Sequence, residues 1–346
     1  MKTEAAILVE LGKPLEVVAL GVPALRAGQA LVEIAYSGVC GTQVNEWLGK
    51  KGEDKWLPHC LGHEATGVVV EVGPGVTKVK ASDKVVLSWL KGSGAEAGGA
   101  VYDWDGRRVN AGGVTTFQRH AVVSENRISR LPDGLPMDIA TMLGCAAPTG
   151  MGAVMNVLKV RPGDTIAVFG TGGVGLNAVM AAAFSGATTI IGVDPSPLRR
   201  SLAKLYGATH VVDPAAGDPL EQIRAVVPTG VDVAVEASGL PAVMAAAMQS
   251  TRIQGGRAVV VGNASHGSMV SVDAATFNQG KSLLGTWGGD SDPDRDFPRF
   301  GRLLGAGRFP VRDLLSKPYG LSEATDALRA LAEGVTGRPL LDMSLT

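Results

Sequence analysis

Cysteine is scarce in this chain, with only three in 346 residues. Such a small, odd number of thiols excludes a scaffold held by disulfides and favours a reducing compartment. An imbalance of charge is also missing, because the formal net charge is −1. The chain therefore offers no electrostatic reason to bind nucleic acid or an anionic membrane, and we expect neither as a partner.

Long hydrophobic runs are absent as well. Charged residues interrupt the first ten residues, MKTEAAILVE, too early for a signal peptide, and the alanine-rich segments at 180–184 and 241–250 are too short to cross a bilayer. We therefore expect a cytoplasmic protein. What the chain has instead is 45% apolar residues, over a length that suits two globular domains.

Residues 165–194 contain the most informative motif. A short apolar run at 165–169 predicts a buried strand, and Gly170, Gly172 and Gly175 follow it as G-x-G-x-x-G. Such glycines allow a tight turn, a close approach of backbone to a pyrophosphate and close packing of helix on strand. Good helix formers come next, and the N-terminus of that helix would face the phosphates. The segment therefore predicts a dinucleotide site.

Asp194 bears on which dinucleotide binds. It ends the next apolar run, 188–193, where a carboxylate can accept hydrogen bonds from both hydroxyls of an adenosine ribose. The same carboxylate would repel a 2′-phosphate, so we predict NAD rather than NADP. Arg199 and Arg200 leave alternatives open, because they could hold a 2′-phosphate, cover the ribose or face solvent.

Secondary-structure patterns divide the chain. Alternating apolar residues and Gly or Pro turns predict a β-rich start without a long amphipathic helix before about residue 138. Strands alternate with helices after the nucleotide motif, with strands expected at 210–213, 231–237, 257–262 and 281–286. The composition predicts irregular structure at 91–113 and after Trp287, then helices near 300–305 and 322–334. The last residues predict a strand that returns to the β-rich part.

Four residues with metal-binding side chains, Cys40, His63, Glu64 and Cys145, form a second candidate site. Thiolate and imidazole are common zinc ligands, and three protein ligands leave one tetrahedral position open for a substrate. The residues lie far apart in sequence, so their spacing alone carries little information. Two small buried hydrophobes and a hydrogen-bonded core histidine would also fit the pattern.

The chain resembles the medium-chain, zinc-dependent alcohol dehydrogenases in the order and approximate spacing of SGVCGTQV, LGHEATGVVVEVGPGV, LGCAAPTGMGAV and VFGTGGVGLNAV. The resemblance implies an α/β plus β fold. A GroES-like β catalytic domain would be built from both chain ends, and a doubly wound Rossmann domain would lie between them. We expect the catalytic domain at 1–146 and 288–346, and the NAD-binding domain at 147–287.

The resemblance also implies roles at the metal. Cys40, His63 and Cys145 would bind one catalytic zinc, and Glu64 would sit behind the metal or enter its shell. Thr42 would hydrogen-bond the substrate oxygen and relay its proton. The implied reaction is the interconversion of a small-molecule alcohol and its aldehyde or ketone by hydride transfer with NAD. We expect a homo-oligomer, a dimer or a tetramer.

A further group of residues would contact the cofactor if the resemblance holds. Thr149 and Val174 would pack near the nicotinamide, and Arg338 would reach the pyrophosphate. The full implied set is Gly170, Gly172, Gly173, Val174, Gly175, Asp194, Arg199, Thr149 and Arg338.

Several departures from the family's pattern stand out. Gln43 occupies a frequent aspartate position beside the zinc histidine, where it can orient a ligand but adds no negative charge. Asn45 occupies a shuttle-histidine position, so we favour water as the proton acceptor, with His59 as the alternative. His59 and Cys60 could be further metal ligands, but adjacent side chains in an extended segment point opposite ways, so we take both as structural. Residues 89–116 contain no cysteine, so we expect no structural zinc, and Gly-rich packing or a subunit contact to order this lobe.

Two rival functions are compatible with parts of the sequence. A zinc-free, NADPH-dependent quinone or enone reductase has the same fold but does not need the cysteines and histidine together. A redox sensor or scaffold that binds NAD without turnover explains the nucleotide motif but leaves the metal-binding residues idle. Metal content and catalytic turnover separate these rivals from an alcohol dehydrogenase.

Overall fold

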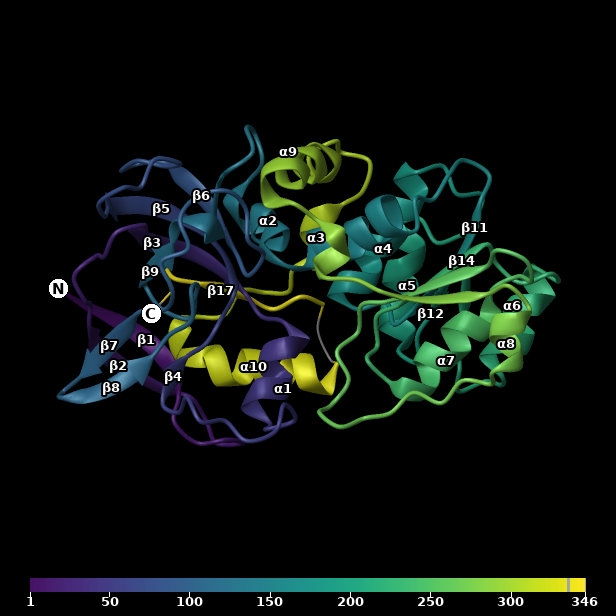
Figure 1. Ribbon diagram of the computed structural model, residues 1–346, viewed down its shortest axis with the longest axis horizontal. Coiled ribbons are helices and arrows are strands. Elements are labelled where there is room, and N and C mark those ends of the chain that lie inside the picture. The colour runs from purple at the N-terminus through teal and green to yellow at the C-terminus, as the bar shows by residue number, and fades with distance from the viewer. Residues whose placement is uncertain (335–336, 346) are drawn as a thin grey trace. The chain divides into compact units, whose positions relative to one another are not determined.

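The computed structural model describes residues 1–334 and 337–345, which form two compact units (Figure 1). The β-rich unit comprises Met1–Cys145, Asp292–Gly307 and Val311–Thr346. The second unit comprises Ala146–Ser291 and Arg308–Pro310. For comparison, the sequence placed the boundaries after residues 146 and 287. Positions 335–336 and 346 of the expected catalytic domain lie outside the described residues.

Strands of the β-rich unit form a barrel and a sheet. The closed barrel follows the order β1 (Lys2–Leu8), β2 (Glu16–Gly21), β7 (Val101–Trp104), β8 (Arg107–Asn110) and β4 (His59–Cys60). The sheet follows the order β10 (Ile128–Arg130), β6 (Lys84–Ser88), β5 (Glu64–Val72), β3 (Gln29–Gly38) and β17 (Leu340–Asp342), with β9 (His120–Ser124) also paired to β3. The helices of this unit are α1 (Gly41–Trp47), α2 (Met137–Ala140), α9 (Pro293–Leu304) and α10 (Ala324–Glu333).

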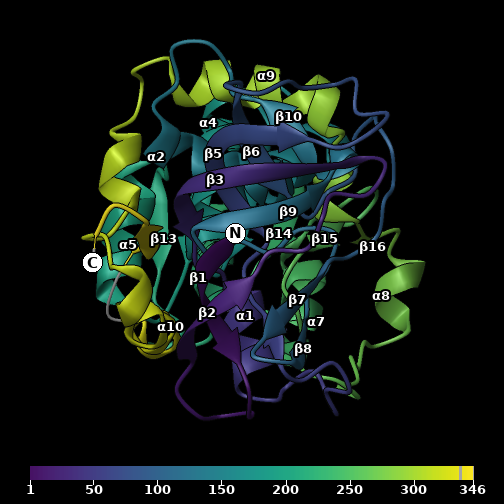
Figure 2. The ribbon, with the colours of Figure 1, turned by 90° about the vertical axis from the view of Figure 1, so that its left-hand side faces the viewer.

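Strand β3 is the element that positions the site. It lies between β5 and β9 (Figure 2) and pairs antiparallel with β5, with Ser37 opposite Ala65. This register places the segment that follows β3 near the segment that precedes β5, because the end of one antiparallel strand lies beside the start of its partner. The C-terminal strand β17 also pairs with β3, with Leu340 opposite Gly38. The predicted return of the chain end to the β-rich part is therefore confirmed.

Two sequence predictions for the β-rich unit are wrong. Residues 101–110, expected to be irregular, form the β7–β8 hairpin, whose turn residues Asp105 and Gly106 both have positive φ. An Asp-Gly pair with positive φ at both positions is the preferred two-residue hairpin turn. Helix α9 begins at Pro293 rather than near residue 300, because the Asp292 side chain accepts from Asp294 N and caps the helix.

The cysteine-free lobe is ordered by polar side chains. Glu125 is buried, and its carboxylate accepts hydrogen bonds from the backbone N–H groups of Thr77, Lys78 and Ala95 at 2.6–2.8 Å. Arg127 donates to the backbone carbonyl of Trp89. The expectation of Gly-rich packing or a subunit contact therefore missed these anchors within the chain.

The second unit is a doubly wound parallel sheet. Its strand order is β13 (His210–Val212), β12 (Thr189–Val193), β11 (Thr165–Phe169), β14 (Val233–Glu236), β15 (Arg257–Val260) and β16 (Ser282–Gly285). In chain order this is 3-2-1-4-5-6, the order of dinucleotide-binding Rossmann folds. All six strands lie within the predicted segments. The helices are α3 (Ala146–Gly152), α4 (Gly173–Phe184), α5 (Pro197–Leu205), α6 (Pro219–Val226), α7 (Pro241–Ser250) and α8 (Ala275–Asn278).

Helices cover the sheet of this Rossmann unit on both sides. Helices α4 and α5 pack together on one side, and α6 and α7 pack together on the other (Figure 1). The central strands are accordingly buried and apolar, as expected for a parallel sheet with two covered faces. Within 1–334 and 337–345, no helix is both long and apolar enough to cross a bilayer.

Candidate active site

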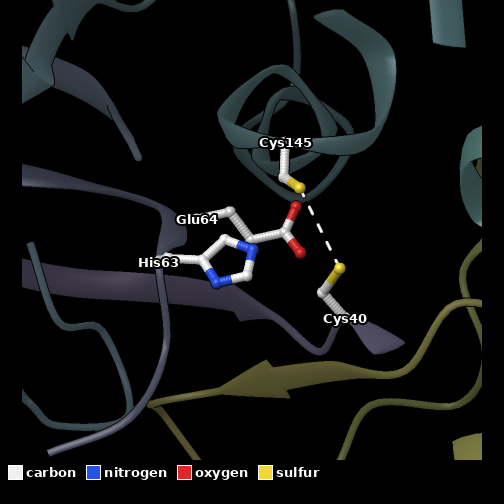
Figure 3. Close-up of side chains that lie close together, drawn as sticks. All are labelled: Cys40, His63, Glu64 and Cys145. Atoms are coloured by element: carbon white, nitrogen blue, oxygen red, sulfur yellow. Dashed lines mark hydrogen bonds between the residues drawn. The ribbon is translucent and has the colours of Figure 1, made fainter. Parts of the chain in front are cut away.

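Four side chains of the β-rich unit converge where β3 and β5 meet: Cys40, His63, Glu64 and Cys145 (Figure 3). Cys40 lies between β3 and α1, whereas His63 and Glu64 lie at the start of β5. Cys145 follows the 3-10 helix Thr141–Gly144, which packs against β6. A Cβ at Gly144 would lie 2.5 Å from the carbonyl oxygen of Leu87, so only glycine fits there.

The geometry of this cluster fits a metal ion. One donor atom from each residue lies within 4.8 Å of the others, and the two sulfurs are 3.9 Å apart. His63 Nε2 and Glu64 Oε2 are buried without a hydrogen-bond partner among the described residues. Buried polar atoms of this kind are rare unless a bound group satisfies them. Two sulfurs and an imidazole nitrogen form a donor set typical of zinc.

Electrostatic effects within the cluster favour a thiolate. The hydrogen bond with Cys145 lowers the pKa of Cys40 well below its usual value and raises that of Cys145. Burial lowers the pKa of His63, but the nearby negative charges of the Cys40 thiolate and the Glu64 carboxylate outweigh burial, so the net shift is upward. The metal-free cluster therefore keeps protons that a divalent cation would displace on binding.

Gln43 connects two of these residues. Its Oε1 accepts from the backbone N–H of Cys40 at 2.7 Å, and its Nε2 lies 3.1 Å from His63 Nδ1. The side chain is fully buried on α1. The predicted ability of Gln43 to orient a ligand agrees with these contacts.

Arg338 forms a buried ion pair with Glu64. Burial raises the pKa of Glu64, while the guanidinium of Arg338 opposes this shift. Gly38 makes room for the pair, because a Cβ there would lie 2.7 Å from Glu64 Cδ. This pairing is absent from the sequence interpretation, since the partners lie 274 positions apart and no local pattern links them. The contact of Arg338 with a pyrophosphate stays a prediction.

The glycine turn of the Rossmann unit has the geometry of a phosphate-binding turn. Gly170 has φ +83°, and a Cβ at Gly175 would lie 1.8 Å from the carbonyl oxygen of Gly170. Gly172 caps α4, and a Cβ there would meet nothing within 4 Å. The turn is therefore tight where the chain packs on itself and open above the N-terminus of a 12-residue helix, which begins at Gly173.

Asp194 is held firmly at the end of β12. Its carboxylate oxygens accept from the backbone N–H groups of Thr171 and Ser196 at 2.8 and 2.9 Å. Arg200 pairs with Asp213 at 2.9 Å and donates to the backbone carbonyl of Asp194. Arg199 is half-buried on α5.

The remaining candidates are distributed between the two units. Thr149 lies on α3, where a Cβ at the adjacent Gly150 would be 2.2 Å from the carbonyl oxygen of Val174. Thr149 and Val174 therefore belong to segments in backbone contact at the start of α4. Thr42 is half-buried on α1 in the β-rich unit, as is Asn45. Their roles toward cofactor and substrate stay predictions.

Comparisons with known proteins agree with this architecture. The family "Alcohol dehydrogenase GroES-like domain" matches residues 26–133, and "Zinc-binding dehydrogenase" matches residues 173–305. Geraniol dehydrogenase of Castellaniella defragrans is 32% identical, over 99% of this chain and 98% of its own length. Two solved structures each have a TM-score of 0.88 and cover 99% of both chains: an alcohol dehydrogenase zinc-binding domain protein of Burkholderia ambifaria at 33% identity, and benzyl alcohol dehydrogenase of Acinetobacter calcoaceticus at 30%.

A GroES-like unit with a thiol–imidazole cluster, joined to a Rossmann unit, defines an oxidoreductase of the dehydrogenase class. More particularly, the chain belongs to the medium-chain, zinc-dependent alcohol dehydrogenase family. Its relatives support a reaction that interconverts alcohols and carbonyl compounds.

Proposed function

We propose that the protein is an NAD-dependent alcohol dehydrogenase with one catalytic zinc ion. The observation that carries this proposal is the cysteine cluster, in which His63 Nε2 has no hydrogen-bond partner among residues 1–334 and 337–345 and lies beside two thiols 3.9 Å apart. A zinc-free reductase would have no need of this arrangement. The substrate we propose is a primary alcohol on an unsaturated or aromatic carbon skeleton, because geraniol and benzyl alcohol dehydrogenases are among the relatives.

Cys40, His63 and Cys145 would hold the zinc ion, which supplies Lewis-acid polarisation of a substrate oxygen when bound. Gln43 orients both Cys40 and the His63 ring through its amide. Arg338 holds the Glu64 carboxylate in place within the cluster. Thr42 Oγ would accept the proton of the substrate hydroxyl and pass its own proton on toward water, because Asn45 cannot titrate near neutrality.

NAD is the nucleotide we propose. The Asp194 carboxylate is already oriented by two backbone N–H groups, and each oxygen retains a lone pair for a ribose hydroxyl. The Arg200 guanidinium is committed to Asp213, which makes it a poor ligand for a 2′-phosphate. Arg199, Thr149, Val174 and Arg338 remain proposed cofactor contacts.

The direct test is turnover of the purified protein on a panel of alcohols and aldehydes, with NAD and NADP compared and zinc measured on the same samples. We expect NAD-dependent oxidation of benzylic or allylic alcohols by protein that carries zinc. Reduction of quinones or enones by NADPH in zinc-free protein would support the rival reductase. Nucleotide binding without turnover on either panel would support the sensor.

A homo-oligomer, a dimer or a tetramer, is also proposed. Strand β16 ends the parallel sheet, and its outer edge has no partner strand in the described part of the chain. Pairing of two copies along this edge would satisfy its backbone groups. Phe277, close to β16 in sequence, is 51% exposed and could add apolar contact. Light scattering of the purified protein measures the assembly, and a monomer would contradict the proposal.

We propose the cytoplasm as the location. All three cysteines are free thiols, and Cys40 and Cys145 lie close enough for oxidation to join them and destroy the cluster. A reducing compartment prevents this reaction. Cell fractionation with a tagged protein would test the location.

A further inference from the structure

A second group of metal-ligating side chains lies outside the cysteine cluster. Glu46, Asp54 and His59 each offer one donor atom, and these atoms lie within 4.8 Å of one another. Glu46 comes from α1, Asp54 from the loop that follows it, and His59 from β4. His59 Nε2 is 2.9 Å from Asp54 Oδ2 and 3.9 Å from Glu46 Oε1.

The His59 ring is fixed in the orientation of a metal ligand. The residue is only 6% exposed, and its Nδ1 lies 3.0 Å from the backbone carbonyl of Cys60. A carbonyl oxygen only accepts, so this bond places a proton on Nδ1 and aims Nε2 at the two carboxylates. Metal-binding histidines typically donate their other ring nitrogen to a carbonyl or carboxylate in this way.

Each carboxylate is also oriented by one oxygen and presents the other to the site. Asp54 Oδ1 accepts from the backbone N–H of Trp56 at 2.9 Å, which leaves Oδ2 facing His59. Glu46 Oε2 pairs with Lys51 at 3.1 Å, which leaves Oε1 facing the same point. Side chains from α1, β4 and the loop between them therefore bring three donor atoms to one point. A hydrogen bond or ion pair to a residue outside the group holds each of these side chains.

We propose that Glu46, Asp54 and His59 bind a divalent first-row transition ion of the zinc class, with water completing its coordination. One imidazole nitrogen and two carboxylate oxygens suit such an ion, whose charge neutralises both carboxylates. The two carboxylates keep 27% and 14% of their side-chain surface exposed, so water can reach the ion. The ion would tie α1 to the loop and to β4. Without a metal, His59 Nε2 and Asp54 Oδ2 would face each other directly at 2.9 Å.

Cobalt(II) titration of the protein with its catalytic zinc in place distinguishes these states. Cobalt at an imidazole–carboxylate site gives weak visible bands, whereas cobalt that replaces the catalytic zinc gives intense thiolate charge-transfer bands in the near ultraviolet. We expect one equivalent of cobalt to bind with visible bands and without the thiolate signal. The titration therefore tests this second metal site independently of the proposed catalytic zinc.

Isosteric variants assign the cobalt signal. Glu46→Gln and Asp54→Asn should each weaken cobalt binding by about tenfold or more, because each removes a charged ligand while keeping the side-chain shape. Glu53→Gln, an equal charge change at an exposed position of the same loop, should leave cobalt affinity unchanged. Uptake of no cobalt beyond the thiolate site, or equal uptake by wild type and both ligand variants, would overturn the proposal.

Discussion

Single side chains at the cysteine cluster decide whether the protein can hold a metal. Two thiols, an imidazole and a carboxylate converge there, and the buried atoms His63 Nε2 and Glu64 Oε2 have no partner in the described structure. Leaving a buried polar atom unpaired costs about 1–3 kcal/mol, so a bound ion would remove a real penalty. Without a bound ion, these two unpaired atoms would lower the free energy of unfolding.

Cys145→Ala should lose the catalytic zinc and with it alcohol oxidation, while nucleotide binding persists because the strands of the Rossmann unit do not include the cluster. Elemental analysis and NADH binding on the same preparation check this. Cys60→Ala is the matched control, since Cys60 is a buried thiol outside the cluster and burial raises its pKa to about 12. If Cys145→Ala retained full zinc and activity, the ligand assignment would be wrong.

Asp194→Ala should weaken NAD binding by roughly tenfold or more, because charge-assisted hydrogen bonds contribute about 1.5–3 kcal/mol each. It should also destabilise the fold, because the N–H groups of Thr171 and Ser196 lose their acceptor. Calorimetric titration with NAD and NADP measures the first effect. Arg200→Ala serves as the comparison and should change the preference little, since Arg200 pairs with Asp213. Equal affinity of the wild type for both nucleotides would contradict the proposed role of Asp194.

Among the structural elements, the cysteine-free lobe shows how a buried anion can order a segment. The carboxylate of Glu125 joins the backbone at Thr77 and Lys78 to that at Ala95, two segments whose three N–H groups would otherwise lose this acceptor. Burial alone would raise the pKa of Glu125, but these backbone donors outweigh burial and lower it. The ionised carboxylate is therefore part of the fold.

Glu125→Gln should lower the free energy of unfolding by about 2–3 kcal/mol near neutral pH, because an amide NH₂ would face a backbone N–H. Since the folded pKa is depressed, this stabilisation is complete above the unfolded pKa of about 4.3 and is lost as the pH falls through the folded value. The gap between wild type and variant should therefore close under acid. Urea unfolding at a series of pH values measures it, with Glu71→Gln at an exposed position of β5 as control. A constant gap would contradict the account.

The elements also show which sequence signals carry structural information. The strand at 165–169 could be predicted because an apolar run ends at the glycine motif, and β11 has those bounds. The β7–β8 hairpin and the start of α9 were also readable, from Asp105-Gly106 and from Asp292-Pro293, because turn and cap residues have local conformational preferences. Both were missed because charge and glycine content suggested irregular structure.

On the scale of the whole molecule, the site depends on contacts that no local pattern contains. Glu64 and Arg338 meet only because β17 pairs with β3, which itself pairs with β5. The family resemblance predicted the four cluster residues, and the structure brings them together. The contacts that orient them are tertiary. Side chains such as Glu46 and His59 likewise become a group only after folding.

Zinc titration of the metal-free protein tests the central claim most directly. The rate of NAD reduction by benzyl alcohol should rise in proportion to added zinc and stop rising at about one equivalent, because the thiolate cluster binds zinc more tightly than an imidazole–carboxylate site. The metal-free protein should still bind NADH. Undiminished turnover in protein free of zinc, or a rate that ignores added zinc, would contradict the account.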